Sequence, residues 1–246
     1  MANTHSIDLE LSSSQYLTAA DSASLSVTGN LTMEFWLKLE QLPSTVGTNF
    51  FLMGKWDAGE NDRSYGIQIS TDNKLALLIS DDGTVSNWFT YVLDEAFDAG
   101  DLGVWIHFAV SVIPSTKTVV FYKNGSPADA TASTSAGTVN SIDDNASLFV
   151  VGARVSSATP QFFVDGKMDE GRLWNDIRTS SEISDNYDQE LVGDEAGLVA
   201  YWKLNDSLLD ETSNDNDLTN NNSATFSTDV PFSGAVSGNS NFFLVM

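Results

Sequence analysis

The chain contains no cysteine and only two histidines among its 246 residues. The absence of cysteine excludes disulfide bonds and thiolate metal sites, and it leaves the redox compartment undetermined. With so few histidines, a catalytic zinc site is hard to assemble. Glycine-rich phosphate loops are also missing from the sequence. These absences remove several large enzyme classes from consideration.

Basic residues are scarce: 11 Lys and Arg face 34 Asp and Glu, so the formal net charge is −23. A surface of this sign repels phosphate backbones, and we therefore expect no nucleic-acid partner. The same charge suits a protein that binds cations or neutral ligands. It is equally consistent with a surface adapted for solubility alone.

Long hydrophobic runs are missing too, since no apolar stretch approaches the roughly 20 residues needed to span a bilayer. We therefore expect no membrane insertion. The N-terminus, residues 1–6, leads into the first expected strand without the apolar segment of a signal peptide. Two interpretations remain open: part of a larger secreted protein, extracellular or on a cell surface, or a virion component that needs no such signal.

What the chain does contain is a series of short β-rich runs separated by Gly, Asn, Asp and Ser clusters. The alternation of Met33, Phe35, Leu37 and Leu39 with polar or bulky partners is typical of a half-buried strand. Such runs recur over residues 6–11, 31–39, 50–55, 65–70, 74–80, 87–93, 104–113, 118–123, 148–153, 166–174 and 198–204. Their spacing predicts an all-β, two-sheet antiparallel β-sandwich with one short helix near 180–190.

A hairpin is predicted between Trp105 and Gly125. Residues 104–112 alternate, with Trp105 and His107 on one face and Ile106 and Phe108 on the other. Residues 114–117 form the turn, residues 118–122 a second strand, and Asn124-Gly125 the next reversal. The predicted hairpin therefore places His107 within a strand.

No linker divides the sequence, and we expect the Ser- and Thr-rich stretch 131–145 to be a surface loop. Residues 1–232 are expected to form one sandwich domain. Residues 233–246 are expected to be a flexible spacer ending in five apolar residues, Phe242 to Met246. That tail could pack on its own sandwich or dock on a neighbouring subunit.

Several separated motifs resemble one family when they are read in order. They are Ser6–Glu10 with Ser14–Leu17, Leu31–Trp36, the Trp105–Gly125 hairpin, Phe163–Asn175 and Gly197–Leu204. Together they resemble a laminin-G-like jelly-roll domain of the concanavalin A-like lectin/glucanase superfamily, of the type found in bacterial and phage surface proteins. The resemblance covers residues 5–232. It implies a jelly-roll scaffold that usually binds a ligand and only sometimes catalyses a reaction.

The acidic loop 205–217 is the first candidate site. Calcium prefers six to eight oxygen ligands from carboxylates, amides and backbone carbonyls, and this loop supplies all three types. The family resemblance implies a structural calcium there, although the family's usual glycine between Ser213 and Asn214 is missing. The candidate metal ligands are Asp210, Asn214, Asp215 and Asp217. The alternative is a solvated acidic turn without a metal.

A second candidate site combines aromatic and polar side chains, as sugar recognition requires. Its candidate ligand-binding residues are Trp56, Asp57 and Asn61 in the 55–65 loop, with Trp88 and Tyr91 on a neighbouring strand. Each of these segments could instead be purely structural. Asp169 and Glu170 form another acidic pair, and we interpret one of them as the structural ion-pair partner of Arg172 or Arg178; a role in ligand binding is the alternative.

Catalysis is not expected. Glucanases with this fold carry two properly spaced acidic residues on one strand, whereas the only E-x-D here, Glu60 to Asp62, has no second Glu at that spacing. The sequence therefore predicts a non-catalytic, calcium-stabilised binding module for glycan or surface-protein recognition, lectin-like and adhesive. The alternative is a virion structural protein, a capsid decoration or appendage component, with tail contacts to other virion or self subunits.

Overall fold

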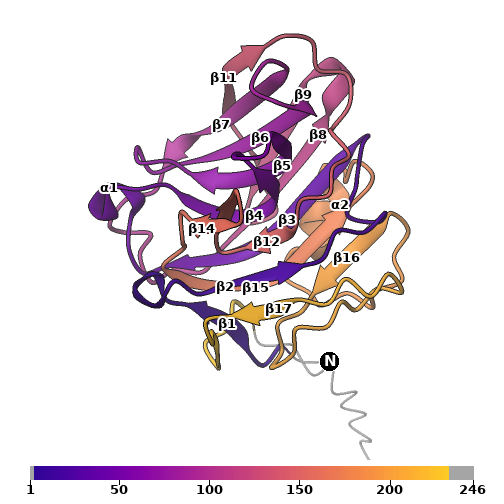
Figure 1. Cartoon of the computed structure of the whole chain (residues 1–246). Coiled ribbons are helices and arrows are strands. Elements are labelled where there is room, and N and C mark those ends of the chain that lie inside the picture. Colours follow the sequence, from indigo (N-terminus) through magenta and orange to yellow (C-terminus); the bar gives the residue numbers. More distant parts are fainter. Residues whose placement is uncertain (1–2, 233–246) are drawn as a thin grey trace, which may run out of the picture.

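The computed structural model describes residues 3–232, which form a β-sandwich of two sheets (Figure 1). Strand pairs are antiparallel, apart from one parallel bridge between β13 and β4. Among the described residues there are two short α-helices, α1 (Pro43–Val46) and α2 (Ser180–Asn186), and two 3-10 turns, Leu11–Ser13 and Pro114–Thr116. The predicted all-β sandwich is confirmed.

The first sheet has eight strands. Its order is β10-β9-β8-β3-β15-β1-β18, and β16 pairs with β15. The strands are β1 (Ser6–Leu9), β3 (Leu31–Leu39), β8 (Ile106–Ile113), β9 (Thr118–Lys123), β10 (Ser126–Ala128), β15 (Gly166–Trp174), β16 (Leu198–Trp202) and β18 (Thr225–Ser227).

The second sheet has ten strands. Its order is β11-β7-β6-β5-β4-β12-β2-β17, with the β13–β14 hairpin attached to β4; these strands follow one another down Figure 1. They are β2 (Tyr16–Ala19), β4 (Phe50–Asp57), β5 (Asp62–Ile69), β6 (Lys74–Gly83), β7 (Trp88–Ala96), β11 (Ala130–Ala136), β12 (Phe149–Val151), β13 (Arg154–Ser156), β14 (Thr159–Gln161) and β17 (Thr219–Asn221).

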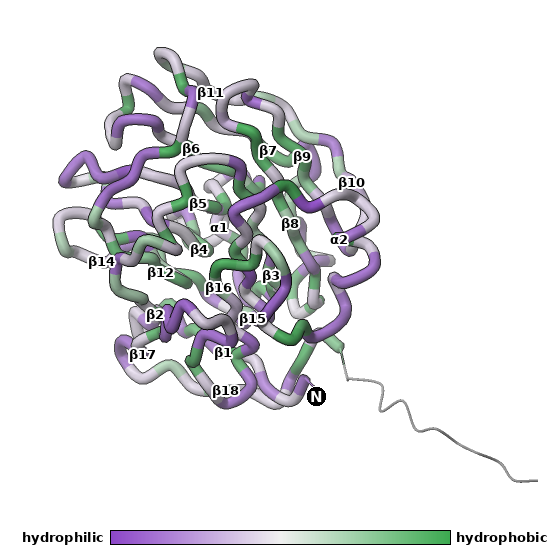
Figure 2. Tube along the Cα trace, turned by 90° about the vertical axis from the view of Figure 1, so that its right-hand side faces the viewer, coloured by the Kyte–Doolittle hydropathy of each residue, from purple (hydrophilic) through white to green (hydrophobic). Residues whose placement is uncertain are grey.

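The core lies between the sheets and follows the period of two expected of strands. Met33, Phe35, Leu37 and Leu39 all belong to one buried cluster, as the alternation in the sequence predicts. Figure 2 shows hydrophobic residues concentrated in strands such as β8, with hydrophilic residues in the surrounding loops. The alternating faces of β3 therefore set which side chains pack inside the sandwich.

The opposite face of the eight-stranded sheet is also buried, because α2 covers part of it. Trp36 donates a hydrogen bond from Nε1 to the Tyr187 carbonyl, at 2.8 Å, just after this helix. A capping box between Thr179 and Glu182 starts α2. His107 is 1% exposed on this covered face, which agrees with a packing role.

The hairpin predicted from residues 105–125 is confirmed. The pairing of β8 with β9 joins Ile113 to Thr118, and the following reversal has Asn124 at φ 49° and Gly125 at φ 75°. Positive φ at both positions is what a type I′ turn requires, which explains the Asn-Gly pair.

The loop expected over residues 131–145 is partly wrong, because residues 130–136 form the edge strand β11 paired with β7. Its Ala, Ser and Thr side chains are too small to produce a clear hydrophobic alternation, so the neighbouring strand decides its conformation. Helix α1 was also not expected; it begins at Pro43 and ends at Val46, and Gly47 follows it with a φ of 81°.

Neither helix between residues 3 and 232 has the length and apolar character needed to cross a bilayer. The apolar segment 242–246 and the spacer before it lie outside the described residues, so the tail expectation stays a prediction.

Candidate functional site

An open groove of about 650 Å³ lies on the outer face of the ten-stranded sheet. On β6 and β7, Leu77 and Phe89 face the core, whereas Leu78, Trp88 and Thr90 line the groove. Because side chains alternate along a strand, one face of β6 and β7 packs the core and the opposite face is free to line the groove. Ligand sites commonly enclose about 300–1,000 Å³, so this groove has room for a sugar-sized ligand.

The floor of the groove is aromatic. A small buried cluster of Phe51, Trp56 and Leu78 supports the partly buried Trp88 and Phe162. The ring centroids of Trp56 and Trp88 are 6.5 Å apart. Gly66 makes room for this arrangement, because a Cβ there would lie 2.6 Å from the Phe51 ring. Trp56 is only 4% exposed, so Trp88 presents the more accessible ring.

Arg154, the first residue of β13, contributes one wall. Its guanidinium carbon lies 4.1 Å from the ring centroid of Phe162, a cation–π contact. Its Nε is buried and has no hydrogen-bond partner. Burial, and then the charge of Arg63, lower the pKa of Arg154 to about 10, while Asp57 opposes this effect. Arg154 therefore stays protonated at neutral pH and retains an unused donor. Phe162 itself has φ 59°, an uncommon conformation for an aromatic residue.

Arg63, near the start of β5, brings a second positive charge to the groove. Its Nη2 donates to the Ala58 carbonyl at 2.7 Å, and its Nη1 donates to the Gly83 carbonyl and to Asn61 Oδ1, both at 3.0 Å. All three acceptors are neutral. Arg63 thus fixes the loop between β4 and β5 without having its charge balanced.

Hydroxyl and amide groups form the remaining rim of the groove, with contributions from Gln68, Thr90, Ser133 and Thr134. The pairing of β11 with β7 shifts register between Ala132 and Thr134, and the Thr134 amide donates to the Thr90 hydroxyl at 3.1 Å. A bulge of this kind re-aims side chains at a sheet edge. It explains why two consecutive residues of β11 reach the groove.

The structure separates the five ligand-binding candidates expected from the sequence. Trp56 and Trp88 both line the groove. Asp57 lines a neighbouring hollow of about 400 Å³ and accepts hydrogen bonds from the amides of Gly59, Glu60 and Ser157. Asn61 holds Arg63, as described above. Tyr91 packs against the core instead, because it lies three residues from Trp88 and so on the other face of β7.

Sequence reasoning missed the two arginines and the polar residues of β11. On β7, the spacing of two residues from Trp88 to Thr90 could have identified Thr90 as a groove residue. Arg63 and Arg154 are far apart in the sequence, and only the pairing of β4 with both β5 and β13 brings them to one groove.

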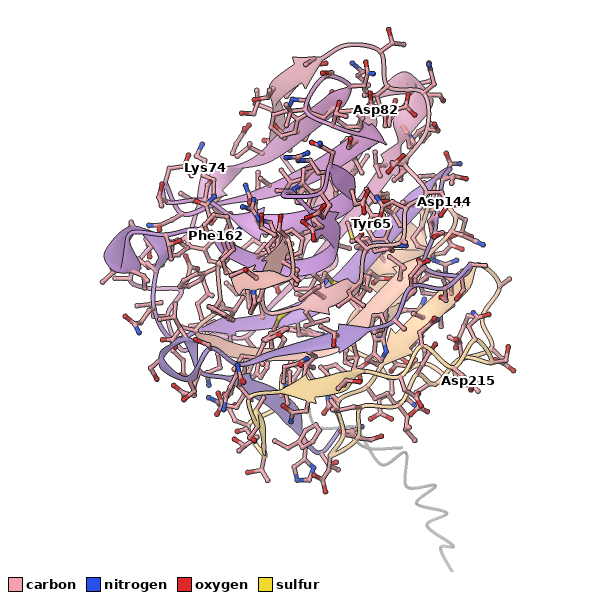
Figure 3. The ribbon with its side chains drawn as sticks, in the orientation of Figure 1. Tyr65, Lys74, Asp82, Asp144, Phe162 and Asp215 are labelled. Atoms are coloured by element: carbon pink, nitrogen blue, oxygen red, sulfur yellow. The ribbon has the colours of Figure 1, made fainter. Side chains whose placement is uncertain are left out.

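The acidic loop lies well away from the groove: Figure 3 places Asp215 at the lower right of the molecule and Phe162 on its left side. In this loop Asp210 is buried and accepts five hydrogen bonds, from the amides of Tyr201, Thr212 and Asn216 and from the Thr212 and Asn216 side chains. These donors occupy the carboxylate oxygens that calcium would need, so Asp210 as arranged does not fit a calcium ligand.

The other calcium candidates differ in their surroundings. Asp217 accepts a hydrogen bond from the Asp210 amide at 2.8 Å. Asn214 donates from its amide to the Val199 carbonyl at 2.9 Å, which leaves its own carbonyl oxygen for another partner. Asp215 is exposed and has φ 55°. A calcium ion would therefore have to rely on Asn214, Asp215, Asp217 and backbone oxygens.

Calcium binding stays a prediction with a direct test. If calcium binds the folded protein preferentially, its addition raises the melting temperature and EDTA lowers it again. Differential scanning fluorimetry of the full chain with calcium, with EDTA, and with magnesium as a control measures this shift. Identical melting curves in all three conditions would contradict the prediction that the folded protein binds calcium.

Another acidic group brings Asp8, Glu10 and Glu40 together on the described part of the chain. Lys167 already pairs with two of the three carboxylates, since its Nζ lies 3.1 Å from Asp8 and also contacts Glu40. Burial by itself lowers the pKa of Lys167, but the hydrogen bonds and negative charges of Glu40 and Asp8 outweigh burial and raise that pKa above its usual value. The group is therefore an ion-pair network with its own cation.

Asp169 and Glu170 lie in β15 next to a buried charge cluster. Glu170 pairs with Arg172 at 2.9 Å, whereas Arg178 pairs with Glu182 at 3.1 Å. The structural interpretation of this acidic pair is confirmed for Glu170. Asp169 instead accepts a hydrogen bond from Asn3, and burial together with the Glu170 charge raises its pKa.

Comparison with known families identifies the scaffold. Residues 11–184 match the laminin G family model described as the concanavalin A-like lectin/glucanases superfamily. A search of curated proteins found no match.

Solved structures share the fold at low sequence identity. A candidate carbohydrate-binding protein from Bacteroides ovatus superposes with a TM-score of 0.68 and 17% identity, over 94% of this chain and 62% of that one. The CBM40 of the Ruminococcus gnavus IT-sialidase, bound to α2,3-sialyllactose, superposes with a TM-score of 0.52 and 11% identity, over 74% of this chain and 96% of that one. The receptor-binding domain of botulinum neurotoxin mosaic serotype C/D superposes with a TM-score of 0.51 and 11% identity, over 70% of this chain and 39% of that one.

Proposed function

The chain belongs to the concanavalin A-like lectin/glucanase superfamily, and we propose that it is a non-catalytic glycan-binding module whose ligand lies in the groove on the outer face of the ten-stranded sheet. The observation that carries this proposal is the groove itself. It combines an accessible indole, Trp88, with a rim of hydroxyl and amide groups. Sugars offer an apolar ring face and many hydroxyls, which such a surface complements.

Two similarities support the proposal. The Bacteroides ovatus structure is described as a candidate carbohydrate-binding protein, and the Ruminococcus gnavus module was solved with a bound sialyllactose. The absence of a paired acid and base also favours binding over hydrolysis: among the described residues lining the groove, the only carboxylate is Asp72. A glycoside hydrolase typically uses two.

We expect the Trp88→Ala variant to bind its glycan about tenfold more weakly or worse, since an aromatic ring at the centre of a binding site typically contributes about 1–2 kcal/mol or more. A glycan array with the full chain identifies the ligand, and calorimetry compares the variant with the wild type. Trp105→Ala is the matched control, because Trp105 is also partly buried but lies outside the groove. Equal losses for both variants, or no ligand on a broad array, would contradict the proposal.

A glycan-binding role fits an extracellular or cell-surface location, with adhesion as the biological outcome. A surface protein could carry the glycan. The virion role, as a decoration or appendage subunit, rests on the segment after Phe232, which lies outside the described residues; mass photometry of the full chain and of a form ending at Pro231 tests it.

A further inference from the structure

We infer that the groove selects an anionic glycan, one whose sugar carries a carboxylate or a sulfate held by Arg154 and Arg63. This inference rests on the proposed function and adds the class of ligand. It comes from a contrast between the protein as a whole, which is strongly acidic, and this one groove, where two positive charges meet.

The two groove arginines differ from the other two in the chain. Arg172 pairs with Glu170 at 2.9 Å, and Arg178 pairs with Glu182 at 3.1 Å. None of the ion pairs formed by residues 3–232 involves Arg63 or Arg154. With 34 acidic residues available, leaving these two unpaired in the same groove calls for a physical reason.

Nearby carboxylates do not balance these charges by direct contact. Asp57 Oδ1 is engaged by three backbone amides, and Asp72 Oδ1 accepts from the Ser70 hydroxyl and the Lys74 amide. Two like charges held close together in a partly buried site repel each other, and a bound anion relieves that repulsion. The buried Nε of Arg154 also has no acceptor within the protein, so no hydrogen bond at that atom offsets the charge of the guanidinium.

The chemistry of the arginines defines the ligand group. A guanidinium presents parallel N–H donors that match the oxygen pairs of a carboxylate or sulfate. Phe162, stacked on Arg154, fixes the orientation of this fork. The acidic group of the sugar would therefore lie at the Arg154 wall, while the sugar ring extends across Trp88 toward the polar rim of β7 and β11. A nucleic acid is disfavoured as an alternative, because the −23 net charge opposes a long polyanion.

Calorimetry with matched pairs of sugars tests the inference. The pairs are α2,3-sialyllactose with lactose, trigalacturonate with its methyl ester, and sulfated with unsulfated N-acetyllactosamine; the first two carry carboxylates and the last a sulfate. We expect the acidic member of at least one pair to bind about tenfold tighter or more than its neutral partner, as a charge-assisted hydrogen bond in a partly buried site typically allows. Added salt should reduce that preference.

Substitutions then locate the preference. Arg154→Gln should abolish the preference for the acidic sugar. Arg154→Lys keeps the charge but lacks the paired N–H donors of the guanidinium, so it should retain part of that preference. Lys123→Gln removes one positive charge outside the groove and should leave it unchanged. Melting temperatures establish that each variant is folded; the Arg154→Lys result remains informative if the Gln variant is unstable.

The outcomes separate this inference from the proposed function. If the acidic and neutral sugars of every pair bind equally well, the anionic selectivity is overturned. If the Trp88→Ala variant also loses that binding, the groove remains a glycan-binding site. An acidic preference that survives Arg154→Gln would also overturn this inference. If no sugar of any pair binds, the anionic selectivity is overturned as well. The broad glycan array then tests the proposed glycan-binding function separately.

Discussion

The Arg172→Met variant is expected to lose about 3–5 kcal/mol in its free energy of unfolding, the loss typical of breaking a buried ion pair from one side. The Arg172 side chain is 1% exposed, and it lies 2.9 Å from Glu170 and 3.7 Å from Glu34. Burial disfavours its charge, but these two carboxylates outweigh burial and raise its pKa. Removing the guanidinium would leave both carboxylates buried without a cation. Urea denaturation at neutral pH measures the change.

Arg178→Met is the matched control, because Arg178 pairs with the much more exposed Glu182 and should contribute about 1 kcal/mol or less. A triple variant, Arg172→Met with Glu34→Gln and Glu170→Gln, should recover much of the loss, since no buried charge is then unpaired. A loss in Arg172→Met no greater than that in Arg178→Met would show that the cluster is not the source of stability that its geometry indicates.

The extent to which the fold could be predicted depended on how strongly each strand is patterned. Residues 31–39 alternate large apolar side chains, and both their limits and their core face were predicted correctly. The edge strand β11 consists of Ala, Ser and Thr, so its own residues carry almost no burial signal. Its conformation comes from hydrogen bonds to β7, which are a tertiary effect.

The candidate site shows the same limit. Trp88 and Trp56 could be identified as candidates from residue type, because an indole next to polar groups is the combination that sugar recognition requires. Arg63 and Arg154 could not, because their importance lies in lacking a carboxylate partner, and that depends on which strands pair. The net charge of the chain even favoured a neutral or cationic ligand. A total charge describes the long-range field, whereas recognition depends on the few groups that a ligand contacts.

Replacing Asp210 with alanine is expected to lower the free energy of unfolding by about 3 kcal/mol or more. Asp210 is 7% exposed, and its carboxylate joins the end of β16 to the following loop by accepting hydrogen bonds from the amides of Tyr201, Thr212 and Asn216. Each buried donor left without an acceptor costs about 1–3 kcal/mol, and water reaching the loop recovers part of that sum. Thermal and urea denaturation measure the loss.

The control for Asp210 lies in the same loop: Asp215→Asn removes an exposed charge and keeps a residue that tolerates its φ of 55°, so in EDTA, where no metal contributes, its effect should stay within about 0.5 kcal/mol. The comparison is made with calcium and with EDTA. Because Asp210 acts through amides of its own chain, its loss should be equally large in both conditions. A loss that appears only with calcium would instead make Asp210 a metal ligand and would require the loop to rearrange around the ion.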